Sequence, residues 1–235
     1  MVDAFLLSGD FAGFNAGGGG MAASLGGQPL GTVLPFTQDP GLFPTSFAYA
    51  WNATSVVSNM GSGNYSVSIA PGLGQIPAFQ MCGAALVVVT QHASYQARTI
   101  TINLGTLTVG DNSANEMVST TFNEIIPNSI GAGQGALMLF TLADDAFNTG
   151  EQLAFNGQSV IAPGAFDGNL GVNASLVVQP VTVQAGANST DITTNGDYFA
   201  WNMAILNSPV PEPSTLTTLL LGIVLMRRSR HRVHR

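Results

Sequence analysis

Period-two alternation of large apolar side chains with small or polar ones is the feature that most restricts the folds open to this chain. It occurs in segments 47–51, 65–69, 100–104 and 199–205, where every second residue is a large apolar or aromatic one. Successive side chains of a strand point to opposite faces, so this spacing predicts strands that bury one face. Outside residues 208–235, no stretch sustains an apolar period of 3.6 beside good helix formers. The pattern therefore predicts an all-β body.

Other segments predict how the strands are placed. Residues 84–89 and 136–142 are apolar on both faces, which suits central strands that other layers cover on both sides. Residues 176–183 also read as a strand. Pro180 lacks the amide hydrogen that an inner ladder needs, so this strand is expected at an edge or at a bulge.

Turn-forming pairs such as Pro71-Gly72 and Asn156-Gly157 separate the strand segments. Many strands at short spacing with such turns favour a single antiparallel β-sandwich or jelly-roll-like domain over residues 1–207. Residues 12–31 are rich in Gly and Ala and are expected to form a flexible loop. Residues 1–10 resemble a first strand.

Charge is scarce and unevenly placed. Before Val210 the chain has twelve acidic residues, one base (Arg98) and no Lys, a net charge of −11. The remainder, with five Arg and Glu212, carries +4, so that the whole chain carries −7. A body without lysine cannot neutralise phosphates, so we expect no nucleic-acid binding, and no docking on an anionic membrane through a basic patch. Cations are the expected charged partners.

Side chains suited to catalysis are few in the body. Its one histidine, His92, reads as a surface-loop residue, and its one cysteine, Cys82, suits a small buried hydrophobe. Ser-His-Asp or Cys-His chemistry would have to use this one surface-loop histidine, and zinc hydrolysis needs several His or Cys ligands. A glycosidase needs only two carboxylates, for which Asp144, Asp145 and Glu151 are candidates, but no glycosidase motif surrounds them. We therefore expect no enzymatic activity.

The same three acidic residues, Asp144, Asp145 and Glu151, are the best candidates for a calcium site. Ca²⁺ takes about six to eight oxygen ligands and tolerates irregular loops. Residues 111–116 are a second candidate stretch. The alternative, that all these are ordinary solvated turn residues, stays open. No other cofactor is expected.

Residues 208–235 differ from everything before them. Val210, Pro211, Glu212, Pro213 and Ser214 form a stretch that cannot continue a strand or a helix. An apolar run suited to a short transmembrane helix follows, and then a basic end that resists translocation and stays cytoplasmic. The membrane segment comprises Thr215, Leu216, Leu219, Leu220, Leu221, Ile223, Val224, Leu225 and Met226, and the basic stop comprises Arg227, Arg228, Arg230 and Arg232.

This order of motif, apolar run and basic end closely resembles the PEP-CTERM sorting signal, with residues 210–214 as its signature. The resemblance implies recognition by an exosortase, which is a membrane transpeptidase. It also implies export through a Sec signal peptide and a link to extracellular matrix or exopolysaccharide. Residues 1–10 lack the basic start of such a peptide, so we expect a leader upstream of Met1.

The apolar run is short for a permanent anchor. Its twelve residues would span about 18 Å as a helix, less than the ~30 Å hydrocarbon core. We therefore expect a transient anchor that an exosortase cleaves near residues 211–213.

The body resembles, more weakly, an uncharacterised β-rich domain of bacterial and archaeal surface proteins. The segments that resemble this domain, in the same order along the chain, are residues 51–57, 63–67, 85–89 and 151–157. This resemblance implies a fold and a location and no activity.

Together these observations favour an exported cell-surface or extracellular-matrix protein without catalytic activity. A carbohydrate-binding module that engages exopolysaccharide is the alternative, and a glycan hydrolase is the third hypothesis. The expected partners are an exosortase, the membrane and exopolysaccharide.

Overall fold

The structure is a computed structural model. It describes residues 3–12, 21–39, 45–71, 79–95, 97–110, 117–126, 133–142, 151–161, 166, 174–194 and 198–210. Within these residues the chain is β almost throughout, with one short helix, so the all-β prediction is confirmed.

The strands follow one another along the chain with the helix between the fifth and sixth. Their bounds are β1 Asp3–Ala12, β2 Met21–Leu25, β3 Gln28–Pro29, β4 Gly31–Asp39, β5 Thr45–Asn52, α1 Thr54–Met60, β6 Val67–Pro71, β7 Phe79–Val89, β8 Arg98–Gly110, β9 Met117–Ile126, β10 Gly133–Leu142, β11 Gln152–Phe155, β12 Gln158–Ile161, β13 Ala174–Val183, β14 Gly186–Thr193 and β15 Tyr198–Pro209.

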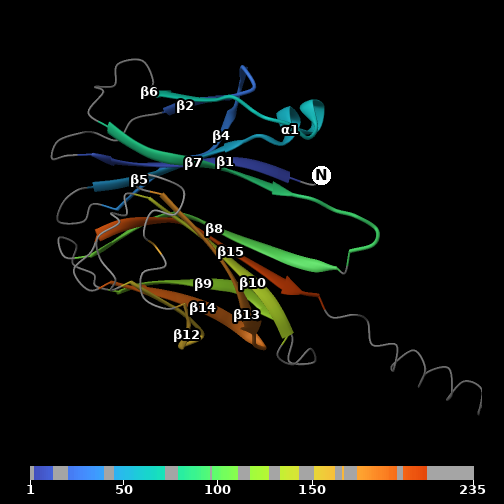
Figure 1. The fold of residues 1–235 in the computed structure, drawn as a ribbon, viewed down its shortest axis with the longest axis vertical. Coiled ribbons are helices and arrows are strands. Elements are labelled where there is room, and N and C mark those ends of the chain that lie inside the picture. The colour runs from blue at the N-terminus through green and yellow to red at the C-terminus, as the bar shows by residue number, and fades with distance from the viewer. Residues whose placement is uncertain are drawn as a thin grey trace, which may run out of the picture.

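In the described residues the strands form four antiparallel sheets. The first sheet has the order β3-β2-β6, the second β4-β5-β1-β7, the third β13-β10-β15-β8 and the fourth β12-β11-β14-β9. Figure 1 shows the first to the fourth sheet stacked in this order from top to bottom. A simple sandwich has two layers, so the stack differs in layer number from the sandwich or jelly roll that we expected.

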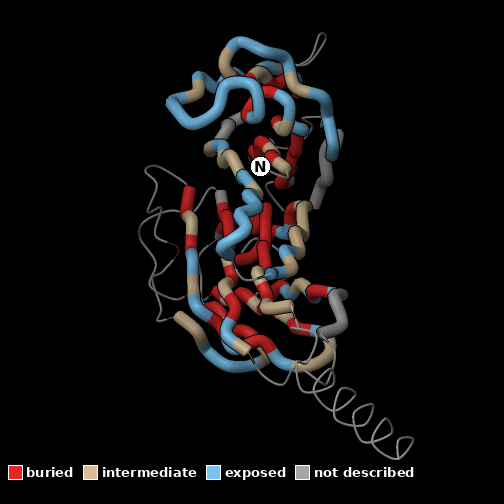
Figure 2. The backbone as a smooth tube through the Cα atoms, turned by 90° about the vertical axis from the view of Figure 1, so that its right-hand side faces the viewer, coloured by how far each residue is buried: buried red, intermediate tan, exposed pale blue. Residues whose placement is uncertain are grey.

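Three apolar clusters fill the spaces between the four sheets. Leu6 and Trp51 of the second sheet pack against Met21 of the first. Leu7 and Ala50 pack on Met203 in the cluster between the second and third sheets. The largest cluster joins the third and fourth sheets and includes several fully buried aromatic side chains. Figure 2 shows the buried residues gathered in these inner layers. The second and third sheets are therefore covered on both faces.

The segments that are apolar on both faces lie in these two inner sheets. In β10, Leu137 and Leu139 face the fourth sheet, whereas Met138 and Phe140 face the second. The prediction of a central, doubly covered strand is confirmed for β10, which pairs with both β13 and β15. For β7 the predicted central position is wrong, because β7 is the edge strand of the second sheet. The predicted cover on both faces is supported, because Leu86 and Val87 pack in different apolar clusters.

Pro180 has the position predicted for it. It lies in β13, which pairs only with β10 and forms the edge of the third sheet. An edge strand has one row of amide groups without a ladder partner, so a proline in that row removes no ladder hydrogen bond. The expected first strand is also confirmed, since β1 lies between β5 and β7.

Helix α1 was not expected from the sequence. Its side chains Val56 and Val57 are buried against Ala4 and Leu25. The Thr54 hydroxyl donates to Asp3 Oδ1 at 2.9 Å and so joins the helix start to β1. Packing of one apolar face thus overrides the low helix propensity of a segment rich in Ser, Thr and Val.

The range 12–31, expected to be a flexible loop, contains regular structure in its described part. β2 and β3 form a hairpin there, and its turn consists of Gly26 and Gly27, whose φ angles of 57° and 76° favour glycine. Glycine in this stretch thus makes a tight turn.

No helix within the described ranges is long and apolar enough to cross a membrane. The segment expected to do so, residues 215–226, lies outside the described residues, as do residues 211–214 and the basic stop.

Candidate functional site

The described part of the predicted calcium site does not resemble a solvated loop. Glu151 directly precedes β11 and is completely buried. Asp144 and Asp145 lie outside the described residues, and so does the second candidate stretch, 111–116. Among the residues that the structure does describe, no three His, Cys, Asp or Glu side chains are grouped to hold a metal ion.

His92 lies in the exposed β7–β8 connection, as predicted for a surface-loop residue. Its Nδ1 is 2.7 Å from the Ser94 hydroxyl and accepts from the Ser94 amide at 3.2 Å. The imidazole also lies against the Tyr95 ring, with 5.2 Å between ring centroids. These contacts link His92, Ser94 and Tyr95 at the tip of the connection.

The third sheet contains a double irregularity at Asn202. On the β8 side, Trp201 pairs with Leu107 but Met203 pairs with Leu104, so β8 carries one extra residue. On the β10 side, consecutive residues of β10 pair with Met203 and Trp201, so Asn202 is itself the extra residue. Bulges re-aim side chains and interrupt ladder pairing, and they are frequent next to binding sites.

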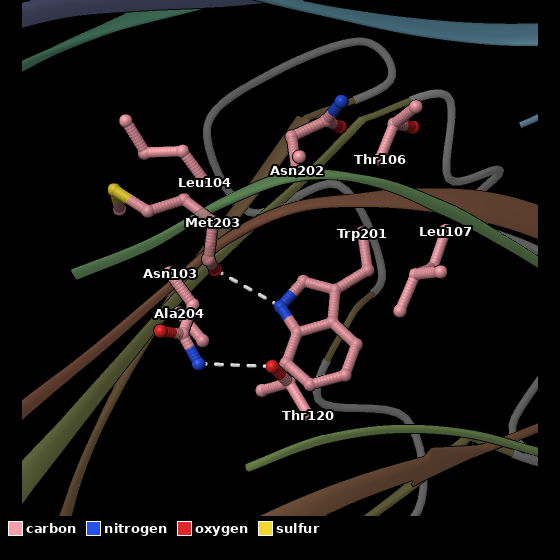
Figure 3. A pocket seen from close by; sticks show the side chains of 10 residues that line it. Asn103, Leu104, Thr106, Leu107, Thr120, Trp201, Asn202, Met203 and Ala204 are labelled. Atoms are coloured by element: carbon pink, nitrogen blue, oxygen red, sulfur yellow. Dashed lines mark hydrogen bonds between the residues drawn. The ribbon is translucent and has the colours of Figure 1, made fainter. Parts of the chain in front are cut away.

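A pocket of about 270 Å³ lies at this irregularity. Figure 3 shows that Asn202 and Thr106 lie on one side of the β8 ribbon, and Trp201, Leu107 and Thr120 on the other. The complete lining is Asn103, Leu104, Gly105, Thr106, Leu107, Thr120, Trp201, Asn202, Met203 and Ala204. The β15 members are buried, whereas Leu107 is 37% exposed. The pocket therefore opens on the β8 side of the sheet.

Hydrogen bonds fix the polar part of the lining. The Trp201 indole donates from Nε1 to the Met203 carbonyl at 2.9 Å, and Asn103 donates from Nδ2 to the Thr120 hydroxyl at 2.9 Å (Figure 3). Asn202 donates to the Phe47 carbonyl at 3.4 Å across to the second sheet. Its buried Oδ1 has no hydrogen-bond partner within the described part of the chain.

A hydroxyl cluster adjoins the pocket between the second and third sheets. The Ser46 hydroxyl lies 2.8 Å from both the Thr106 and the Thr108 hydroxyls, and all three side chains are buried. Sequence reasoning missed this cluster, because single Ser and Thr residues at inward positions of strands give no distinct pattern.

The lining of the pocket has no side chain suited to acid–base chemistry. None of its ten lining residues is ionisable, and its indole N–H is already hydrogen-bonded. Indole, amide and hydroxyl groups around an apolar cavity suit a small neutral ligand.

Val210, the first residue of the predicted sorting motif, is bonded to the body. β15 and β8 pair as far as Pro209 and Arg98, and the Val210 amide then donates to the Ala97 carbonyl at 3.2 Å. Arg98 donates from its guanidinium to the Gln134 carbonyl at 2.9 Å. Of the predicted motif, only Val210 lies within the described residues.

Comparison with known proteins gives fold likeness alone. No protein-family model matches the chain, and no curated protein does. Two similar solved structures are much longer than this chain. A β-porphyranase of glycoside hydrolase family 86 from the human gut bacterium Bacteroides plebeius has a TM-score of 0.34 and 14% identity, over 90% of this chain and 30% of that one. Dimeric latent PorU from Porphyromonas gingivalis has a TM-score of 0.37 and 12% identity, over 88% and 24%.

A third similar structure is a family 35 carbohydrate-binding module from Clostridium thermocellum. Its TM-score is 0.27 with 18% identity, over 48% of this chain and 94% of that one. At TM-scores below 0.5 these likenesses say nothing about what this chain does.

Proposed function

We propose that this chain is a non-enzymatic protein of the cell surface or extracellular matrix, delivered by exosortase-dependent sorting. The observation that carries the proposal is the order of elements after β15. The last strand ends at Pro209, and the Pro-Glu-Pro motif, the apolar run and the basic end follow directly. The last strand among the described residues thus ends directly before the stretch that resembles PEP-CTERM.

Each part of the signal has a physical role in this proposal. The prolines at 211 and 213 keep the segment extended, which is the form that a protease active site accepts. The apolar run inserts into the bilayer, and the arginines stay on the cytoplasmic side. Because the run is short, insertion positions the motif for cleavage and does not hold the protein permanently.

The test is mass spectrometry of the protein from its native host, with and without a functional exosortase. We expect most surface-located protein to end near residues 211–213, and to keep residues 227–235 in the exosortase-deficient host. A Pro213→Ala variant should accumulate uncleaved, whereas Pro209→Ala, outside the motif, should be processed normally. Surface protein that still carries residues 227–235 in the wild-type host would overturn the proposal.

A second candidate function is binding of exopolysaccharide at the pocket beside Trp201. The supporting observation is its lining, because an indole beside neutral amide and hydroxyl groups suits a sugar, which is uncharged and has apolar ring faces. An exopolysaccharide pull-down tests this function. Leu107→Arg, at the mouth, should abolish retention. Val178→Arg is the control, since Val178 is 53% exposed on β13 at the other edge of the same sheet. Equal retention of the two variants would contradict binding at the pocket.

A further inference from the structure

We propose that the end of the body from which the tail leaves is a membrane-contact surface, which lies against the bilayer while the tail is inserted. This inference rests on the proposed function, since it requires an inserted tail. The tail-exit surface, as we define it, comprises residues 90–95, 97–100, 133–136 and 207–210. Hydrogen bonds and strand pairing join 97–100, 133–136 and 207–210 around Pro209. Residues 90–95 belong to the connection that leads into β8, on the same side of the stack (Figure 1).

The first argument is the length of chain between the body and the bilayer. The Val210 amide is still bonded to the carbonyl of Ala97, directly before β8, and the predicted membrane segment begins at Thr215. Five residues extend at most about 18 Å, at roughly 3.5 Å per residue. An inserted tail therefore holds this end of the body within the depth of the lipid headgroup region or just above it.

The second argument is charge. The body has twelve acidic residues and one base, yet the tail-exit surface contains no acidic residue and does contain that base, Arg98. Asp3 pairs with Val89, the residue just before this surface, and its carboxylate accepts a hydrogen bond from the Thr54 hydroxyl of α1. The part of the body held nearest the bilayer thus lacks the charges that anionic headgroups would repel.

The third argument is the apolar and aromatic content of the surface. Tyr95 is 68% exposed, more than any other large hydrophobic side chain in the described residues, and Ile100 is 37% exposed. Tyr95 lies at the tip of the β7–β8 connection, where its amide donates to the His92 carbonyl at 3.0 Å. Figure 1 shows this connection and the end of β15 on the same side of the stack. Tyrosine is enriched where apolar lipid meets water, because its ring is apolar and its hydroxyl polar.

The exosortase is a competing occupant, because it must also reach the chain near Pro209. The tether favours the bilayer, since a five-residue connection keeps the surface near lipid throughout insertion, whether or not an enzyme is bound.

The test uses the full chain in vesicles of phosphatidylethanolamine and phosphatidylglycerol that carry a headgroup-proximal nitroxide quencher. Cys82 is replaced by alanine, and an environment-sensitive fluorophore is attached through Ser94→Cys. The matched control position is Met117→Cys, which is 58% exposed at the start of β9. We expect blue-shifted emission and several-fold stronger quenching at position 94 than at 117. Adding Tyr95→Ser should reduce the quenching at 94 while circular dichroism stays unchanged.

Carbonate extraction of the same vesicles distinguishes failure of the membrane-contact surface from failure of tail insertion. Chain that is retained in the vesicles but quenched equally weakly at both positions would overturn the membrane-contact surface and leave the sorting proposal intact. Chain that is not retained would overturn insertion, and the inference would fall with it. Equal quenching together with slower tail cleavage of Tyr95→Ser in the host would assign the surface to the exosortase instead, which also overturns bilayer contact.

Discussion

Asn188→Ala is the substitution for which the structure gives the clearest expected cost. The side chain is 1% exposed and joins the turn of the β11–β12 hairpin to the connection between β13 and β14. Its Oδ1 accepts from the Gln184 amide at 3.0 Å and from Asn156 Nδ2 at 2.8 Å. Its Nδ2 donates to the carbonyls of Gln184 and Gly186 at 3.1 and 3.2 Å. Alanine removes all four bonds.

The magnitude follows from what happens to the groups left behind. A typical hydrogen bond contributes about 1 kcal/mol net, and a buried group left unsatisfied costs more. Gln184 is exposed, so water can replace the bonds to its backbone, whereas Asn156, in the turn of the β11–β12 hairpin, is half-buried. We therefore expect a loss of about 2–3 kcal/mol in the free energy of unfolding. Asn156→Ala should lose less, and the double variant should show a coupling of about 1 kcal/mol.

Urea unfolding of a chain that ends at Val210 measures the effect, with an unchanged m-value as the sign that only stability has altered. Ser159→Ala is the control, because that exposed side chain makes a single bond of 3.3 Å to the Ile161 carbonyl. It should lose less than about 0.5 kcal/mol. If Asn188→Ala costs no more than Ser159→Ala, the assignment of a structural role to this asparagine is refuted.

Three further changes test the packing and the metal hypothesis. Gly135→Ala should lose about 1–3 kcal/mol in urea unfolding, because an added Cβ would lie 2.5 Å from Val183 Cγ2, and Gly31→Ala, with open space around it, should be near neutral. Thr141→Val should leave stability unchanged or raise it by about 1 kcal/mol in the same assay, because the buried Thr141 hydroxyl has no hydrogen-bond partner within the described ranges. Calcium should raise the melting temperature if the predicted site exists, magnesium should not, and Glu151→Gln should remove the rise. A melting curve that millimolar calcium leaves unmoved would count against the calcium site.

Strand positions were predictable because they depend on local spacing. The alternation in 47–51 and 199–205 reports one buried face per strand, and the structure places those residues in β5 and β15. Pro180 was equally informative, since a missing amide hydrogen restricts a strand whatever surrounds it.

The number of layers was not predictable from the same pattern. The sequence pattern of a strand with one large apolar face is the same in two cases. Its other face can meet water, or it can pack with small residues against a neighbouring sheet. In β5 the alternate residues Ala48 and Ala50 are as buried as Phe47 and Tyr49, because the second sheet lies between two others. Alanine is small enough to allow this packing but gives no signal of it in the sequence.

The pocket and the tail-exit surface differ in how far the sequence could locate them. The pocket depends on two register shifts at Asn202, and a bulge in this strand leaves no mark in its composition. The tail-exit surface gathers segments more than a hundred residues apart, so its lack of acidic residues becomes visible only when strand pairing is known.

The attachment point of the tail has a mechanical consequence for a protein displayed through it. Tension on the tail enters the body at Pro209 and runs along β15, which pairs on one side with β8 and on the other with β10. Hydrogen bonds of antiparallel ladders lie perpendicular to the strands, so pulling along β15 loads both ladders in shear and many bonds at once. An edge strand such as β13 would oppose the same force with a single ladder. Attachment of the tail to an inner strand of a doubly covered sheet therefore opposes extraction with two ladders where an edge strand would offer one.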